Sequence, residues 1–133
     1  MRLALFEDQA SAGFVPIAWM RPVFELLCGQ FSLRERLLRC QCVSEWGAFL
    51  RPFLAEMYEE AQPEARVNDF KWLGHEPTLL INGRWLPDVD GVRRLEHVAN
   101  NEAGIIDQTV VWLRLDPSET SLLTWENWDD TLL

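Results

Sequence analysis

The stretch that decides the fold is Met1-Arg-Leu-Ala-Leu-Phe-Glu-Asp8, an apolar run that ends in two acidic residues. A short apolar run bounded by charge is typical of a buried strand, so residues 2–6 are predicted to form one. The polar, glycine-containing residues 7–13 predict a loop. Polar side chains just past a buried strand lie where α/β proteins bind ligands. The opening therefore predicts both a sheet and a site at its carboxyl edge.

Two helices are predicted further along the chain. Ser32 stands three residues before Glu35, the pattern of a capping box, which predicts a helix over residues 33–42. A second helix is predicted over residues 45–61, because apolar residues recur there at intervals near three and four; Pro52 either interrupts it or starts its longer portion. These apolar residues are Trp46, Phe49, Leu50, Phe53, Leu54 and Met57.

The remaining elements follow from shorter patterns. Two prolines make residues 14–23 a shaped loop, and residues 67–70 fit a short strand or a loop. Strands are predicted at 78–81, 103–106 and 109–115, the last two around a turn at 107–108. Short helices are predicted within 88–102 and from 117, and an acidic, aromatic tail over 125–130.

Strands that alternate with helices favour an α/β fold: a layered, mostly parallel sheet with flanking helices. The 133 residues fit one domain, residues 1–133, or the N-terminal part of one. Seven tryptophans are many for this length. Because tryptophan is large and rarely buried completely, some are expected at a cleft, at an interface or under a further segment.

Charge and composition exclude several classes of protein. The net charge of -9 disfavours binding to nucleic acid or to anionic lipid. No run of 18 apolar residues is present to span a membrane, and the N-terminus lacks the pattern of a signal peptide, so a cytoplasmic protein is expected. Cys28, Cys40 and Cys42 match no disulfide framework and are expected to be free thiols.

Candidate site residues follow the first strand. Glu7 and Asp8 could hold a metal ion or accept a hydroxyl group, or they could begin a solvated turn. Arg21, fixed beside Pro22, could bind a phosphate in bidentate fashion, or it could pair with Glu25 or Glu7 at the surface.

The segment Asn82-Gly83-Arg84 follows the second predicted buried strand and could line a ligand pocket, or it could be a plain tight turn. Neither His75 nor His97 has a serine or cysteine arrangement that suggests a nucleophile. The phosphate-binding loop of P-loop proteins and the dinucleotide fingerprint are both missing, so any phosphate must bind to another loop.

Several segments of the chain form a pattern that is found together in a known family: residues 1–8, 15–17, 21–22, 25–26, 28–29, 32–36 and 79–84. They resemble the sugar nucleotidyltransferase-like proteins related to the N-acetylglucosamine-1-phosphate uridyltransferase pyrophosphorylase domain. The resemblance implies a nucleotidyltransferase-like, Rossmann-like fold, a nucleoside triphosphate and a sugar phosphate as ligands, and Mg²⁺. A homo-oligomer or a C-terminal β-helix domain are further partners that it implies.

The chain also departs from the family pattern. Phe6-Glu7-Asp8 stands where a Gly-rich loop begins in the wider superfamily, Pro16-Ile17-Ala18 replaces Pro-Leu-Thr, and Val23 stands where a lysine follows Pro22. Arg84 stands where the superfamily has a metal-binding aspartate. Nucleotidyl transfer depends on positioned positive charge, which the missing lysine would supply directly and the missing aspartate through a bound metal ion.

Two functions therefore remain open. In the first, the domain forms a nucleotide sugar: Arg21 and Arg84 are the catalytic cations, and Glu7 and Asp8 hold Mg²⁺. The nucleotide and the sugar would then contact Phe6, Glu7, Asp8, Arg21, Asn82, Gly83 and Arg84. In the second, the domain keeps the fold and binds a nucleotide, a sugar or a protein partner without turnover.

Overall fold

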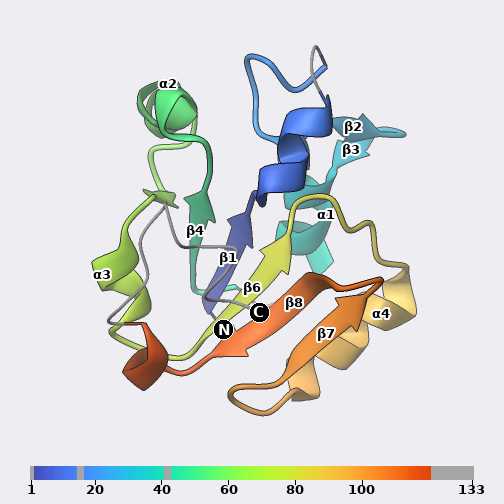
Figure 1. Ribbon diagram of the computed structural model, residues 1–133, viewed down its shortest axis with the longest axis vertical. Coiled ribbons are helices and arrows are strands. Elements are labelled where there is room, and N and C mark those ends of the chain that lie inside the picture. The colour runs from blue at the N-terminus through green and yellow to red at the C-terminus, as the bar shows by residue number, and fades with distance from the viewer. Residues whose placement is uncertain (1, 15–16, 41–42, 121–133) are drawn as a thin grey trace.

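A six-stranded sheet forms the centre of the molecule (Figure 1). The structure is a computed structural model and describes residues 2–14, 17–40 and 43–120. The strand order is β5-β4-β1-β6-β8-β7. β5, β4, β1 and β6 run parallel to one another, β8 runs antiparallel to β6, and β7 runs antiparallel to β8. The strands are β1 (Arg2–Phe6), β4 (Glu45–Phe49), β5 (Arg66–Val67), β6 (Thr78–Asn82), β7 (Ala103–Ile106) and β8 (Thr109–Leu115). The predicted α/β fold with a mostly parallel sheet is confirmed.

Helices cover both faces of the sheet. The α-helices are α1 (Leu33–Cys40), α2 (Ala55–Ala61), α3 (Phe70–Leu73) and α4 (Val89–Arg94). Short 3₁₀ helices span Gln9–Phe14, Val23–Glu25, Pro52–Leu54, Leu95–His97 and Pro117–Glu119. A separate two-stranded hairpin consists of β2 (Leu27–Cys28) and β3 (Phe31–Ser32), with Gly29 at φ 81° between them.

The core has two parts because alternate residues of each strand face opposite sides of the sheet. On one side, Leu3 and Leu5 of β1 pack with side chains of α1, α2 and α4. On the other side, Ala4 and Phe6 pack with Trp72 of α3 and with β8. All five residues of β1 are therefore buried, as expected for the middle strand of a parallel sheet.

Most of the predicted elements are present. The strands at 103–106 and 109–115 have the predicted bounds, and Asp107 and Gln108 have the positive φ angles of a tight hairpin turn. The capping box is formed: the Glu35 backbone N–H donates to Ser32 Oγ at 3.2 Å, and the Ser32 backbone N–H donates to Glu35 Oε1 at 3.5 Å. α1 begins at the predicted residue; positions 41–42 of the predicted helix lie outside the described residues.

The single helix predicted over residues 45–61 is wrong. Residues 45–49 form β4, and only Pro52–Leu54 and Ala55–Ala61 are helical. β4 is buried on both faces, so Trp46 and Phe49 are both apolar although they face opposite sides of the sheet. A strand buried on both faces can imitate the helical spacing of apolar residues.

The segments left open from the sequence are now assigned. Residues 66–67 form β5, Asn68 takes a positive φ of 50°, and Asp69 caps α3 by accepting a hydrogen bond from the Trp72 backbone N–H at 3.1 Å. The predicted loop 7–13 contains a 3₁₀ helix, and the short helices expected in 88–102 and from Pro117 are present. The predicted tail at 125–130 lies outside the described residues.

The tryptophans and cysteines bear out part of the sequence-based expectation. Trp19 is 58% exposed and Trp85 is half-buried beside a cavity, whereas Trp46 and Trp72 are buried in the core. Cys28 is an exposed free thiol. In the described part of the chain, no helix has the length and apolar character needed to cross a membrane.

Candidate functional site

Three polar residues singled out from the sequence, Glu7, Asp8 and Asn82, lie at one edge of the sheet together with Arg51. β4, β1 and β6 run parallel, so their carboxyl ends meet there (Figure 1). Glu7 and Asp8 follow β1, Arg51 follows β4, and Asn82 ends β6. In open α/β sheets this is the edge at which ligands bind.

The Glu7 carboxylate contacts Arg51, which follows β4, and Val23, which begins a 3₁₀ helix. Its side chain is 0% exposed, and its Oε2 atom lies 3.2 Å from Nη2 of Arg51. Oε1 accepts hydrogen bonds from the backbone N–H of Arg51 at 3.2 Å and from Nε of Arg51 at 3.3 Å. Oε2 also accepts a hydrogen bond from the backbone N–H of Val23 at 3.3 Å. A buried carboxylate is stable only when it is paired and hydrogen-bonded, and Glu7 meets both conditions.

Arg51 also fixes the loop that carries Arg21. Its Nη2 atom donates to the carbonyl oxygens of Ala18 at 2.5 Å and of Arg21 at 3.0 Å. The Arg51 guanidinium therefore connects β4, the Glu7 carboxylate and the loop before the 3₁₀ helix at Val23–Glu25. Through this contact, Glu7 and Arg51 hold the backbone of Arg21 in place.

Asp8, Asn82 and Arg84 form a second cluster on the other side of β1. Asp8 accepts two hydrogen bonds from the Arg84 guanidinium, from Nε to Oδ1 at 2.7 Å and from Nη2 to Oδ2 at 2.6 Å. Asn82 Nδ2 donates to Asp8 Oδ2 at 2.9 Å and to the carbonyl oxygen of Val110 at 3.0 Å. Paired, parallel contacts of this kind fix the plane and the direction of a guanidinium.

These contacts also set the protonation of Asp8. Burial alone would raise the pKa of the Asp8 carboxyl group, but hydrogen bonds from Arg84 and Asn82 and the positive charge of Arg84 outweigh it, so the pKa is lowered from 3.8. Asp8 is therefore ionised at neutral pH. Its charge and that of Arg84 largely cancel within the cluster.

Gly83 is needed for packing. A Cβ atom at this position would lie 2.9 Å from Cδ1 and 3.3 Å from the backbone nitrogen of Phe24. Its backbone N–H donates to the carbonyl oxygen of Phe6 at 2.8 Å. The space beside Gly83 is thus taken by Phe24, which explains the glycine without a ligand.

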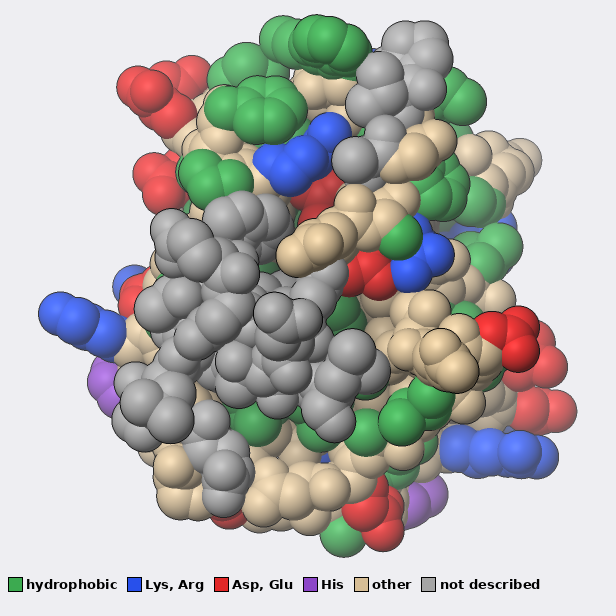
Figure 2. Space-filling model, in the orientation of Figure 1, with side chains coloured by type: hydrophobic (Ala, Val, Ile, Leu, Met, Phe, Trp, Pro, Cys, Tyr) green, Lys and Arg blue, Asp and Glu red, His purple; other side chains and the backbone are tan. Residues whose placement is uncertain are grey.

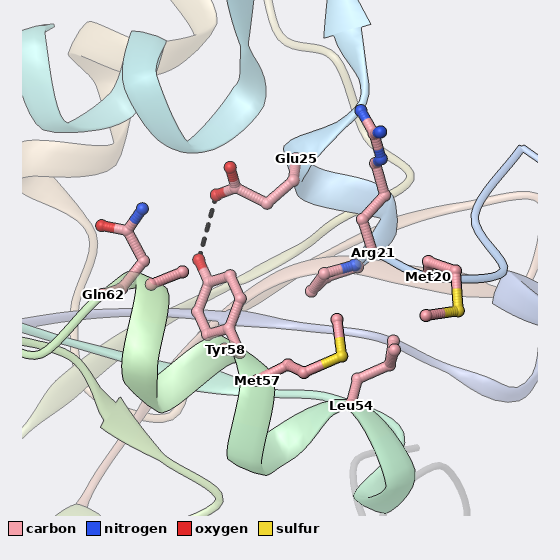
Figure 3. Close-up of a pocket in the computed structure, with 9 residues that line it drawn as sticks. Met20, Arg21, Glu25, Leu54, Met57, Tyr58 and Gln62 are labelled. Atoms are coloured by element: carbon pink, nitrogen blue, oxygen red, sulfur yellow. Dashed lines mark hydrogen bonds between the residues drawn. The ribbon is translucent and has the colours of Figure 1, made fainter.

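Two cavities flank these clusters. One, of about 310 Å³, is lined by Arg84, Asn82 and Trp85 together with residues of the β7–β8 hairpin, among them Asp107 and Thr109. The other, of about 230 Å³, lies between the loop at Met20–Pro22 and α2 (Figure 3). Its lining residues are Met20, Arg21, Pro22, Glu25, Leu54, Met57, Tyr58, Ala61 and Gln62.

Glu25 in the smaller cavity has its own partners. Tyr58 donates a hydrogen bond to Glu25 Oε1 at 3.0 Å, and Arg34 forms an ion pair with the same carboxylate. The Arg21 side chain points away from the Glu25 carboxylate (Figure 3). Of the ion pairs among described residues, none includes Arg21, so its alternative role as a surface partner of Glu25 or Glu7 is wrong.

The arrangement of donors does not fit a Mg²⁺ ion held jointly by Glu7 and Asp8. Both oxygens of each carboxylate accept a hydrogen bond from an arginine or a backbone or amide N–H. The described residues also contain no group of three or more His, Cys, Asp or Glu side chains that could hold a metal ion. Binding of Mg²⁺ by these two residues stays a prediction, and it would require the arginines to give up their carboxylate contacts.

The predicted site residues thus separate into distinct places. Asp8, Asn82 and Arg84 come together beside the larger cavity, whereas Arg21 lies at the smaller one. The Phe6 side chain is 1% exposed and packs in the core, so only its backbone reaches the edge of the sheet. No local pattern indicates a role for Arg51, because its partners lie 30 to 44 residues away along the chain.

The parallel sheet defines an α/β protein, and the polar cluster at its carboxyl edge is a candidate ligand site, at the place where open α/β sheets bind ligands. A family model described as sugar nucleotidyl transferase matches residues 3–128. The chain therefore belongs to the sugar nucleotidyl transferase family, as the resemblance in its sequence predicts.

Two further comparisons accompany the family match. A crystal structure of 4-diphosphocytidyl-2C-methyl-D-erythritol synthase is similar to this chain, with 14% sequence identity and a TM-score of 0.41. The similarity covers 92% of this chain and 80% of that one. The comparison with curated proteins finds no match.

Proposed function

We propose that this chain binds a nucleoside triphosphate and a sugar 1-phosphate and joins them into a nucleotide sugar. A phosphate oxygen of the sugar phosphate would attack the α-phosphorus of the nucleotide. The bond between the α-phosphorus and the bridging oxygen would break, and pyrophosphate would leave. Membership of the sugar nucleotidyl transferase family supports this reaction class.

The observation that carries the proposal is the position of Arg84. Its guanidinium is held by Asp8 in a fixed orientation, and it lines the cavity of about 310 Å³ next to Asn82. A fixed guanidinium binds phosphate oxygens with little loss of entropy. Arg84 would therefore bind a phosphate group, while Asn82 and Trp85 would contact the sugar or the base.

Arg21 would supply the second cation. Its side chain is exposed at the rim of the smaller cavity, and the Arg51 guanidinium holds its backbone. Positive charge on both sides of β1 would stabilise the charge that moves from the attacking to the leaving phosphate oxygen. No step of this proposal depends on a metal ion.

Ligand binding can be tested by thermal denaturation with UTP, CTP or dTTP, each with and without Mg²⁺. A ligand that binds only the native state stabilises it by about 2.7 kcal/mol at 100 times its dissociation constant. We expect one nucleotide to raise the melting temperature of the natural chain and of Arg93→Ala, an exposed arginine on α4, but not of Arg84→Ala. No shift with any nucleotide would refute the proposed ligand class.

A second candidate function is binding without turnover. The observation in its favour is that Glu7 and Asp8 are both neutralised by arginines, which leaves little net positive charge for the transition state. Release of pyrophosphate with a panel of sugar 1-phosphates distinguishes the two functions. Turnover that is lost in Arg21→Ala and Arg84→Ala supports the enzyme, whereas a thermal shift without pyrophosphate supports binding alone.

A further inference from the structure

An exposed apolar patch lies on the loop after β1 and on the helical segment after β4. Single apolar side chains on a surface are ordinary, but contiguous patches mark interaction sites. We call this the loop–α2 patch, and its members are Ile17 (69% exposed), Trp19 (58%), Met20 (59%), Phe53 (65%) and Met57 (50%).

The two halves of the patch are held next to each other. Met20 and Met57 line the same cavity, one from each half (Figure 3). Arg51 donates to the carbonyl oxygen of Ala18, and its guanidinium carbon lies 5.5 Å from the ring centre of Phe53. Phe53 and Met57 are four residues apart in consecutive helical segments, which places them on one side of the helix. Met20, Phe53 and Met57 are therefore held together, and Ile17 and Trp19 precede Met20 on the same loop.

Acidic residues border this surface along α2. Glu56, Glu59 and Glu60 are exposed, and residues 53–65 contain no lysine or arginine. Figure 2 shows hydrophobic side chains gathered over α2 and the loop after β1, with acidic side chains at the outer edge. Arg21 is an exposed base that lines the adjoining cavity.

We propose that the loop–α2 patch docks a protein segment that presents apolar side chains flanked by lysine or arginine. Apolar contact would supply the buried area, and the glutamates of α2 would select for positive charge and speed association. A second copy of this chain fits poorly, because both copies carry a net charge of -9 and would place the same glutamates near each other. Anionic lipid is disfavoured by the same charges.

The test uses the full chain and a fluorescently labelled helical peptide composed of leucine on one face and lysine on the other. Two matched peptides replace the lysines by glutamate or the leucines by serine. We expect the leucine–lysine peptide to bind at least about tenfold more tightly than either of the others, measured by fluorescence anisotropy at physiological salt.

Variants connect the binding to this surface. Trp19→Ser and Phe53→Ser should each weaken binding about tenfold, and Glu59→Gln combined with Glu60→Gln should weaken it and flatten its salt dependence. Leu86→Ser is the control, because Leu86 is 52% exposed but lies outside the patch. Circular dichroism would verify that each variant is folded.

Three results would overturn the proposal. The first is equal binding of all three peptides. The second is equal weakening by Leu86→Ser and Trp19→Ser. The third is a concentration-dependent dimer in sedimentation velocity that Trp19→Ser abolishes, because the patch would then be occupied by a second copy of the chain.

Discussion

Arg51 and Glu7 form an ion pair in which the glutamate side chain has no exposed surface and the arginine side chain is 16% exposed. The arginine also holds the backbone of Ala18 and Arg21. This pair joins β1, β4 and the loop between β1 and α1. It is therefore both a core contact and the support of Arg21, the proposed second cation.

Removal of the charge on Glu7 should destabilise the protein. Glu7→Gln keeps the shape of the side chain but leaves the Arg51 guanidinium without its counter-ion, which costs about 3 kcal/mol in the free energy of unfolding. Urea denaturation of the natural chain and the variant measures this difference. Glu59→Gln, at an exposed position of α2, should stay within about 0.5 kcal/mol of the natural chain. Equal effects of the two substitutions would contradict the structural role of Glu7.

Substitution of two glycines by alanine should have different effects on the stability of the protein. Gly83→Ala places a Cβ atom 2.9 Å from Phe24, so the backbone or the ring must shift, at a cost of about 1–3 kcal/mol. Gly13→Ala meets nothing within 4 Å and should leave the stability unchanged or slightly increased. Thermal denaturation of both variants is sufficient to compare them. A larger loss for Gly13→Ala would show that the packing around Gly83 is looser than described.

Tyr58 should not ionise while the protein is folded. Burial is the main cause that raises the pKa of its phenol, and the charge and hydrogen bond of Glu25 raise it further. The folded state therefore favours the neutral phenol. The resulting stabilisation is fully present below the ordinary tyrosine pKa of about 10, and it is lost as the pH rises through the higher pKa of the folded state.

Since Tyr58 is the only tyrosine of the chain, its absorbance at high pH can be followed without interference from others. We expect tyrosinate absorbance to appear together with the loss of circular dichroism as the pH is raised. Tyr58→Phe should lack this absorbance change. Ionisation of the tyrosine in a chain that is still folded would refute the contact with Glu25.

Because of the Asp8–Arg84 pair, the free energy of unfolding should fall as the solution is made acidic. The pKa of Asp8 is lowered in the folded state, so its contribution is present above its ordinary pKa of 3.8 and is lost as the pH falls through the lower, folded value. Asp8→Asn should therefore be less stable than the natural chain at pH 6, and the difference should shrink below pH 4. Asp90→Asn, an exposed substitution on α4, is the control. A difference that stays constant over this range would contradict the ion pair.

The sequence predicts local structure better than contacts between distant segments. The hairpin of β7 and β8 and the capping box at Ser32 follow from neighbouring residues, and both were predicted from pattern alone. β4 was mistaken for helix, because side chains from distant segments bury both of its faces: Trp46 packs in one core cluster and Phe49 in the other. That burial is a property of the whole fold.

The candidate site shows the same contrast between local patterns and contacts between distant segments. The polar residues at the ends of β1 and β6 were predicted to contact the same ligands, and Asp8, Asn82 and Arg84 lie together in the structure. Their separation from Arg21, and the part played by Arg51, depend on how loops from three strands meet. A pattern of neighbouring residues cannot predict contacts between loops that lie far apart in the sequence.

The central position of β1 also bears on the order in which the protein is built. Its partner residues in β4 lie 43 positions later (Arg2 with Glu45), and those in β6 lie 76 positions later (Leu3 with Leu79). Such long-range pairings must close large loops before they gain any stability, which slows folding. During synthesis, the first strand to be made therefore waits for β6 before both of its edges are covered. The cluster of Asp8 and Arg84 can form only after that, so the candidate site is among the last parts of the molecule to be completed.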